Sequence, residues 1–248
     1  MTIEEIQAGK IFLINKPYRW TSFDAVNKLK WRLKNELSGE KKTSQGTGNQ
    51  KPETKNKFKI GHAGTLDPLA TGLLIICTGK ETKNIDQYQA QEKEYTGTFF
   101  IGATTPCFDL EKPVDHTYPS DHITKEMINA AAKKFTGIQQ QVPPIFSAVK
   151  VKGKRAYDIA RSGKTALIEA RAITIHVFEI TRIQMPEVDF RIVCSKGTYV
   201  RSLARDFGLE LKSGAHLTAL CRTRIGAFEL KNAEKLEGGT REEKIKGP

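Results

Sequence analysis

Hydrophobic positions near the N-terminus predict a strand followed by an amphipathic helix. Residues 11–14 form a short apolar run, and Lys16-Pro17 ends it because proline has no N–H group to continue a strand ladder. Thr21 and Asp24 then stand at capping-box spacing. Apolar residues follow at helical intervals, namely Val26, Leu29, Leu33 and Leu37. The pattern predicts a helix with its lysines and Arg32 on the outer side.

Later apolar patterns predict further strands and helices. Residues 93–102 are rich in Tyr, Thr and Phe and favour a strand, whereas residues 123–135 carry apolar side chains at helical spacing. The remaining predicted elements are strands over 168–184 and 188–195, a helix over 199–211 and strand-like patterning over 216–230. No internal repeat is visible in the sequence.

Two segments lack any core-forming pattern. Residues 39–57 contain no hydrophobic side chain and predict a mobile loop. Its five lysines against two glutamates could contact RNA phosphates, but a solvated insertion without a role is the favoured interpretation. The end of the chain, 238–248, is polar and charged. With 248 residues in all, we expect one catalytic domain over 1–237 and a short tail.

The composition indicates a globular protein that attracts polyanions. Hydrophobic residues make up 38% and charged residues 27% of the chain, which is enough apolar material for a sizeable core. Lys and Arg number 40 against 28 Asp and Glu, giving a formal charge of +12. Nucleic acid therefore heads the list of partners, although a merely basic globular protein fits the charge about equally well.

Cysteine and histidine positions indicate neither a disulfide framework nor a metal site. Cys77, Cys107, Cys194 and Cys221 lie far apart and form no C-x-x-C pair, and the histidines show no ligand spacing. A reducing cytoplasm fits best. The acidic, polar N-terminus and the lack of a long apolar stretch predict neither a signal peptide nor a membrane anchor.

The most informative segment is residues 61–72, which read G-H-A-G-T-L-D-P-L-A-T-G. Its three glycines permit close approach of the backbone to a ligand. Pro68 keeps Asp67 away from helical torsions and holds its carboxylate in an extended turn. An isolated Asp-Pro pair would more often be a plain turn.

This segment resembles the catalytic motif of the TruB family of pseudouridine synthases, which modify the T-loop uridine of tRNA. The resemblance extends in sequence order across most of the chain. It includes Lys16-Pro17 with Thr21-Ser22, Tyr95, residues 143–150 with 153–161, residues 194–201, and residues 214–226.

The resemblance implies a mixed α/β fold, with a long, mostly antiparallel central sheet flanked by helices and a catalytic cleft. It implies binding of the tRNA T arm and conversion of the uridine at position 55 to pseudouridine, without a cofactor. Separately, we expect a monomer with no obligatory protein partner. Asp67 is then the catalytic carboxylate. Attack on the sugar, attack on the base and abstraction of a sugar proton all remain open as its route.

Other site residues follow from the same resemblance. Arg201 matches the arginine that pairs with the catalytic aspartate, although a phosphate contact is the alternative. Tyr95 matches the tyrosine that packs against the target base and could take its proton. Tyr199 resembles the family tyrosine that lines the same pocket, and an ordinary packing residue at the start of a helix is the alternative. His62 resembles the histidine that occupies the space left by the flipped uridine, whereas an isolated histidine would more often be a loop residue.

Several basic residues are expected to contact RNA. Lys16 fits a family position near the pocket, although Lys before Pro is also a common exposed turn. Residues 143–165 resemble a mobile thumb that grips RNA, and its basic residues are expected phosphate contacts: Lys150, Lys152, Lys154 and Arg155.

The chain departs from the family pattern at a few positions. Arg19 stands where the family usually has glycine, and Thr105-Pro106-Cys107 interrupts a stretch that is usually rich in Thr and Asp. We also expect no C-terminal PUA domain. The alternative functions are a guide-RNA-dependent synthase acting on ribosomal RNA and a non-catalytic tRNA-folding chaperone.

Overall fold

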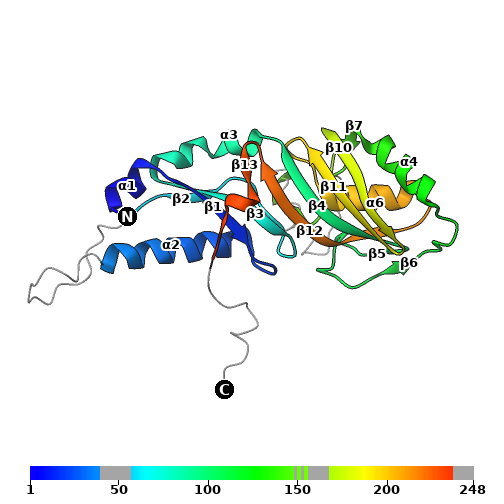
Figure 1. Ribbon diagram of the computed structural model, residues 1–248, viewed down its shortest axis with the longest axis horizontal. Helices are drawn as coiled ribbons and strands as arrows, with labels where there is room; N and C mark the ends of the chain where they lie inside the picture. Colours follow the sequence, from blue (N-terminus) through cyan, green and yellow to red (C-terminus); the bar gives the residue numbers. More distant parts are fainter. Residues whose placement is uncertain (40–56, 148–149, 152–153, 156–167, 237–248) are drawn as a thin grey trace, which may run out of the picture. The chain divides into compact units, whose positions relative to one another are not determined.

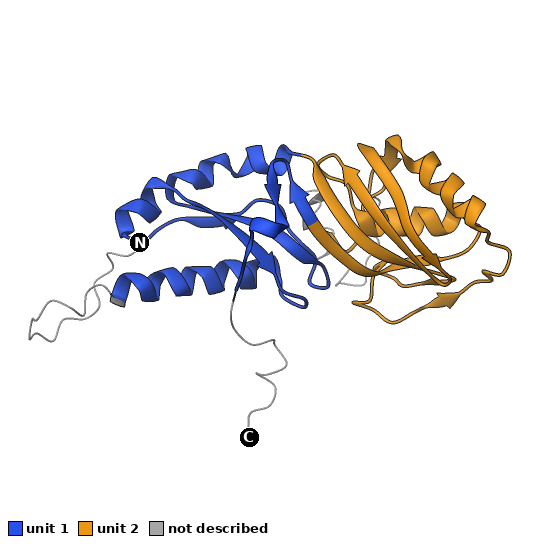
Figure 2. Cartoon of the chain, in the orientation of Figure 1, with its two compact units in different colours: residues 1–91, 223–248 blue, residues 92–222 orange. Residues whose placement is uncertain are grey.

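The computed structural model describes residues 1–39, 57–147, 150–151, 154–155 and 168–236. The chain divides into two compact units, which Figure 2 distinguishes by colour. Unit 1 combines Met1–Gln91 with Thr223–Pro248, and unit 2 is Glu92–Arg222. The catalytic domain predicted over 1–237 stays a prediction, because its boundary with the tail lies outside the described residues.

Unit 1 is built from the N-terminal half of the chain and a short C-terminal return (Figure 1). Its elements are α1 (Ile3–Ala8), β1 (Ile11–Lys16), α2 (Ser22–Gly39), β2 (Ile60–His62), β3 (Thr71–Thr78), the 3-10 helix η3 (Gly79–Asn84), α3 (Ile85–Ala90), β13 (Phe228–Glu229), the 3-10 helix η4 (Leu230–Asn232) and β14 (Glu234–Lys235). β1 pairs antiparallel with β3 and parallel with β14. β2 also pairs antiparallel with β3.

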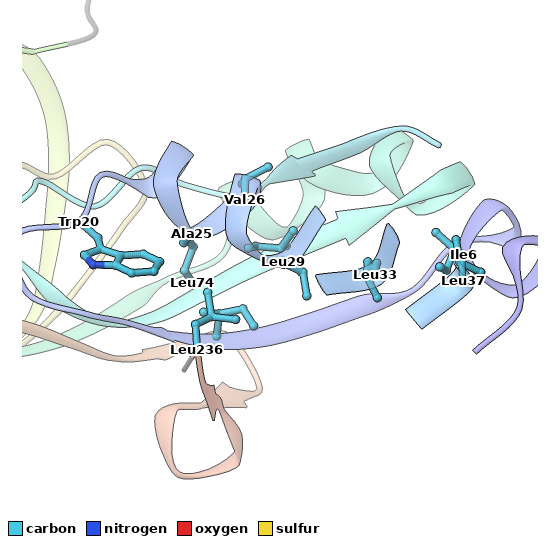
Figure 3. Packing of buried hydrophobic residues seen from close by; sticks show 11 residues of the cluster. Ile6, Trp20, Ala25, Val26, Leu29, Leu33, Leu37, Leu74 and Leu236 are labelled. Atoms are coloured by element: carbon cyan, nitrogen blue, oxygen red, sulfur yellow. The ribbon is translucent and has the colours of Figure 1, made fainter. Parts of the chain in front are cut away.

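The helix predicted after Thr21 is confirmed as α2, together with its cap. The Asp24 N–H donates to Thr21 Oγ1 over 3.1 Å, and the Thr21 N–H donates to Asp24 Oδ2 over 2.9 Å. Figure 3 shows the inner face of α2, from Ala25 to Leu37, packed with Ile6, Trp20, Leu74 and Leu236. This reciprocal cap and the apolar face together determine where α2 begins and which side it buries.

The apolar run of β3 is buried on both faces, which explains why its sequence does not alternate. Leu74 and Ile76 belong to the cluster under α2. Leu73, Ile75 and Cys77 belong to a second cluster, against which Ile85 and Tyr88 of α3 pack. β3 is therefore held firmly from both sides, and the loop that precedes it starts from a rigid strand.

Unit 2 contains the longest strands. Its elements are β4 (Lys93–Ile101), β5 (Ala103–Thr104), β6 (His116–Thr117), α4 (Lys125–Phe135), β7 (Gly137–Gln141), β8 (Lys150–Val151), β9 (Lys154–Arg155), β10 (Arg171–Gln184), β11 (Glu187–Cys194), α6 (Val200–Glu210) and most of β12 (Ala215–Ile225). The strand order is β12-β4-β11-β10-β7, and β4, β11, β10 and β7 pair antiparallel with one another in that order.

Four phenylalanines form the centre of unit 2. Phe99 of β4 lies 4.2 Å from Phe190 of β11 and 5.3 Å from Phe207 of α6, measured between ring centroids. Phe178 of β10 packs 5.5 Å from Phe207. Because aromatic side chains bury large areas, this cluster fixes α6 against the sheet and thereby sets the position of its first turn.

The mixed α/β class and the mostly antiparallel sheet are confirmed, and most predicted elements agree to within a few residues. The strand-like stretch predicted over 216–230 is divided by a turn at Gly226, whose φ is +52°, into β12 and β13. α1 was not predicted, although Thr2 and Glu5 form a capping box. Among the described residues, no helix is long and apolar enough to cross a membrane.

Candidate active site

Asp67 lies in unit 1, in the loop that connects β2 to β3, and its side chain is partly buried. Hydrogen bonds hold the loop on both sides of Asp67. The Leu66 N–H donates to Ser22 Oγ over 2.8 Å, and the Ser22 hydroxyl lies 3.2 Å from the Leu66 carbonyl oxygen. The Ala70 N–H donates to the Asp67 carbonyl oxygen over 3.1 Å. The start of α2 therefore holds the residue before Asp67 in place.

Lys16 holds the other side of the same loop. Its side chain is 0% exposed, and its ammonium donates to the carbonyl oxygens of Pro17, Trp20 and Pro68 over 3.0, 2.5 and 3.3 Å. A buried ammonium is tolerated only where acceptors replace its water shell. Lys16 thus connects the Lys16-Pro17 turn with the residue that follows Asp67.

The backbone conformation of Arg19 bears on one departure from the family pattern, the arginine that stands where the family usually has glycine. Its φ is +66°, a left-handed conformation that glycine adopts without strain and that other residues adopt rarely. The turn before α2 therefore has the geometry that glycine favours, and here an arginine occupies it. The guanidinium carbon of Arg19 lies 5.7 Å from the centre of the Tyr18 ring.

His62 is the last residue of β2 and pairs in register with Ile76 of β3. It is partly buried and belongs to unit 1, as do Asp67 and Lys16. Unit 1 thus brings together three of the predicted site residues on β1, β2 and the loop that follows β2.

Tyr95 lies on β4 of unit 2, opposite Ile192 of β11, and is 8% exposed. Lys93 stands two residues earlier, so it lies on the same face of the strand. Burial, with a smaller contribution from the positive charge of Arg222, lowers the pKa of Lys93 to about 8. The Tyr95 side of β4 is therefore a buried region with cationic side chains.

Arg201 lies in the first turn of α6 and is 5% exposed. Its guanidinium donates to the carbonyl oxygens of Cys107 and Phe146 over 3.2 and 3.0 Å. Its Nε lies 3.6 Å from Oδ2 of Asp109, and both side chains of this ion pair are buried. Asp67 belongs to the other unit, so its predicted pairing with Arg201 stays a prediction.

A tight turn presents Asp109 to Arg201. Phe108 has a φ of +65°, and the Thr105 hydroxyl donates to the Asp109 carbonyl oxygen over 2.6 Å. The Phe108 ring lies 5.1 Å from the guanidinium carbon of Arg205, one turn after Arg201 on α6. This left-handed residue lets the backbone oxygen of Cys107 and the carboxylate of Asp109 reach the same guanidinium.

Tyr199 is the N-cap residue of α6. Its N–H donates to Gln141 Oε1 over 2.8 Å, and its carbonyl oxygen accepts from Gln141 Nε2 over 3.1 Å. Its ring packs with Ile145 against Ile168. The helix-start packing alternative and the pocket role are both compatible with this position.

The predicted RNA-gripping segment is described only in part. Lys150 in β8 pairs in register with Arg155 in β9, next to Lys154, so these three residues share a two-stranded hairpin. Lys152 lies outside the described residues, as do 40–56 of the predicted insertion and the tail.

Three residues of these sites were not predicted from the sequence. Ser22 belonged to a matched block but received no role, and Lys93 precedes Tyr95 in an ordinary strand pattern. Asp109 lies two residues after the Thr105-Pro106-Cys107 departure, and a carboxylate in a stretch that is usually rich in Thr and Asp was the available signal.

Comparisons with known proteins agree with the resemblance. Residues 51–200 match the family described as TruB family pseudouridylate synthase (N terminal domain). The tRNA pseudouridine synthase B of Flavobacterium johnsoniae is 57% identical over 233 residues, covering 94% of this chain and 95% of that protein. The protein of the same name from Phocaeicola vulgatus is 49% identical, covering 92% and 91%.

A solved structure shares the fold. A crystal structure of a Cbf5-Nop10-Gar1 complex superposes with a TM-score of 0.65 at 28% identity. The match covers 94% of this chain and 54% of that chain, so the chain spans about half the length of this structural relative.

Lys16→Met is expected to lower the free energy of unfolding by about 2 kcal/mol or more, because buried carbonyl oxygens lose their donor. Lys10→Met is the control: Lys10 has a partly exposed side chain and an ion pair of 3.4 Å with Glu5. Urea unfolding of both variants measures the difference. Equal stability of the two variants would show that the Lys16 ammonium does not hold the loop.

Asp109→Asn and Arg201→Gln are expected to be strongly non-additive. Either change alone disrupts a buried ion pair, whereas the double variant removes both partners. A double-mutant cycle by thermal unfolding should give a coupling energy of roughly 1–3 kcal/mol. Additive losses would mean that the ion pair contributes nothing to stability. The control cycle combines Arg201→Gln with Asp121→Asn, because Asp121 is exposed.

The stability of the wild type relative to Lys93→Met is expected to rise with pH between about 8 and about 10.5. Lys93 titrates near 8 in the folded state and near 10.4 when unfolded, so the unfolded state binds more protons in this window. Below pH 8 both states are protonated and the burial penalty is fully present. Unfolding curves at pH 7 and 9.5 measure the change, and a flat difference would contradict the lowered pKa.

Proposed function

The chain belongs to the TruB family of pseudouridylate synthases, and we propose that it isomerises the T-loop uridine at position 55 of tRNA with Asp67 as the catalytic carboxylate. The observation that carries this proposal is the 57% identity to a tRNA pseudouridine synthase B over 94% of the chain. The chain is accordingly an isomerase that makes pseudouridine in tRNA. Our proposal concerns the position of the modified uridine and the roles of the site residues.

The reaction breaks the N-glycosidic bond, rotates the base and rejoins it through carbon. A carboxylate is needed in its ionised form for each open route, whether it attacks sugar or base or removes a sugar proton. Asp67 suits this role because Lys16 and Ser22 hold the residues on either side of it. A carboxylate whose backbone is already held loses little entropy when the substrate arrives.

Unit 2 supplies the other proposed catalytic groups. Arg201 would stabilise the charged carboxylate of Asp67 while Asp109, Cys107 and Phe146 hold its guanidinium in position. Tyr95 would pack against the flipped base and could accept its proton, and Tyr199 would line the same pocket.

The remaining residues would act on RNA or on the loop. His62 would fill the space left by the flipped uridine. Lys150, Lys152, Lys154 and Arg155 would contact phosphates of the T arm. Lys16 is better assigned to positioning than to RNA, because its ammonium is buried and donates to three carbonyl oxygens.

The protein would act as a monomer in a reducing cytoplasm. All proposed catalytic residues come from one chain, and its four cysteines are free thiols. No observation favours the guide-RNA-dependent alternative: the Cbf5 structure is 28% identical, compared with 57% for the bacterial tRNA synthase.

The proposed function predicts one pseudouridine in the T loop when the protein alone is incubated with an unmodified tRNA transcript. Asp67→Asn should bind the transcript within a few-fold of wild type and form no detectable product, because it keeps the shape and removes the charge. Chemical mapping of pseudouridine together with filter binding measures both quantities.

The outcomes separate the alternatives. Product only after a guide RNA is added would favour the guide-dependent synthase. Binding and refolding of tRNA without product would favour the chaperone. Product at full rate from Asp67→Asn would remove Asp67 from the catalytic role, and product at another uridine would refute the assignment to position 55.

A further inference from the structure

The outer side of α2 carries exposed aromatic residues. Four aromatic side chains are strongly exposed among the described residues, and three of them lie within residues 18–31. These are Tyr18, Phe23 and Trp31, which are 45%, 66% and 59% exposed. Exposed apolar side chains that gather in one region often mark an interaction site, whereas singly scattered ones are ordinary.

Phe23 and Trp31 leave α2 on the side away from the core. The opposite side, which includes Leu29 and Leu33, faces the cluster in Figure 3. Eight residues separate Phe23 from Trp31, which corresponds to about 12 Å along a helix. That length matches the rise of three to four stacked nucleotides at about 3.4 Å each.

Lysines accompany these rings. Lys28 lies in cation–π contact with Trp31, its Nζ 5.1 Å from the ring centre, and Lys30 and Lys34 follow on the same helix. Within the described residues, the structure shows no ion pair for these three lysines.

The acidic residues of α2 do not neutralise this charge. Asp24 accepts hydrogen bonds from Thr21, and Glu36 pairs with Arg32 over 3.8 Å. The outer face therefore combines net positive charge with exposed rings.

We propose that the α2 outer face, defined as Phe23, Lys28, Lys30, Trp31 and Lys34, binds a single-stranded RNA segment outside the candidate active site. The lysines would neutralise phosphates, and the rings would stack on unpaired bases, which is the usual combination for single strands. This inference rests on the proposed function only in taking RNA as the polyanion.

Two other occupants fit less well. An interfacial membrane helix inserts its apolar face into lipid, but the apolar face of α2 is buried in the protein core. Protein interfaces are depleted in lysine, whereas three lysines flank the exposed rings along α2. Single-stranded RNA is the partner that uses both the charges and the rings.

Tryptophan fluorescence tests the contact directly. The chain has two tryptophans, of which Trp20 is 8% and Trp31 is 59% exposed. Titration with a short oligouridylate should quench the emission of the wild type, and the change should be largely absent in Trp31→Phe. Equal quenching in both proteins, or the same quenching by inorganic polyphosphate, would refute stacking on this face.

Charge removal tests the phosphate contacts. The triple variant Lys28→Gln, Lys30→Gln, Lys34→Gln should raise the Kd for oligouridylate roughly tenfold and lower the log–log salt slope by about two, at about 0.7 for each phosphate contact to a single strand. The matched control replaces the exposed lysines Lys112, Lys125 and Lys133 of unit 2 by glutamine, with the same loss of charge. Equal losses in both triple variants would mean that only net charge matters and would overturn the proposal.

The two proposals fail separately. Pseudouridine formation by a wild type whose Trp31 emission does not respond to RNA refutes the α2 outer face alone. A response of Trp31 without any pseudouridine formation leaves the α2 outer face intact and refutes the proposed reaction.

Discussion

The burial of the Lys16 ammonium is the constraint on which the geometry around Asp67 depends. A fully buried cation is stable only when acceptors replace its hydration, and three carbonyl oxygens, those of Pro17, Trp20 and Pro68, do so. The last of these, Pro68, directly follows Asp67 and lies 52 residues after Lys16 in the chain. Ser22 adds a second connection, because α2 begins there and its hydroxyl binds Leu66. The packing of α2 thus determines where the Asp67 loop lies.

Unit 2 follows the same principle with a guanidinium. The Arg201 guanidinium donates to the carbonyl oxygens of Cys107 and Phe146 and forms an ion pair with Asp109. All three partners lie on chain segments that have little regular structure of their own. Because removing one partner of a buried pair costs far more than an exposed pair contributes, such a group specifies one arrangement of the loops around it. The left-handed Phe108 is part of that arrangement. In unit 1 a buried cation therefore organises the loop that carries Asp67, and in unit 2 the buried cation is itself a proposed catalytic residue, held in place by the loops around it.

The sequence predicted the features that depend on local pattern. The spacing of Leu29 and Leu33 predicted α2, and its Thr21–Asp24 cap was visible in four residues. The family resemblance predicted the fold class and singled out Asp67 as the candidate catalytic carboxylate. Features that depend on contacts between distant parts of the chain were not predictable. Lys16 was expected to contact RNA and is instead buried inside the protein. Nothing in the sequence indicated that Asp109 pairs with Arg201, which lies 92 positions later. The division between β12 and β13 was missed because Gly226 interrupts an otherwise continuous strand pattern.

The Asp67 loop is already ordered in the free protein, because Lys16 and Ser22 hold the residues on either side of Asp67. Hydrogen exchange at single-residue resolution measures this most directly. The amides of Leu66 and Ala70, which donate to Ser22 and Asp67, should exchange far more slowly than in an unstructured peptide, and RNA should add little protection. Exchange of both amides at the unstructured rate in the free protein, with protection only after RNA is added, would show that RNA orders the loop and that Lys16 and Ser22 do not.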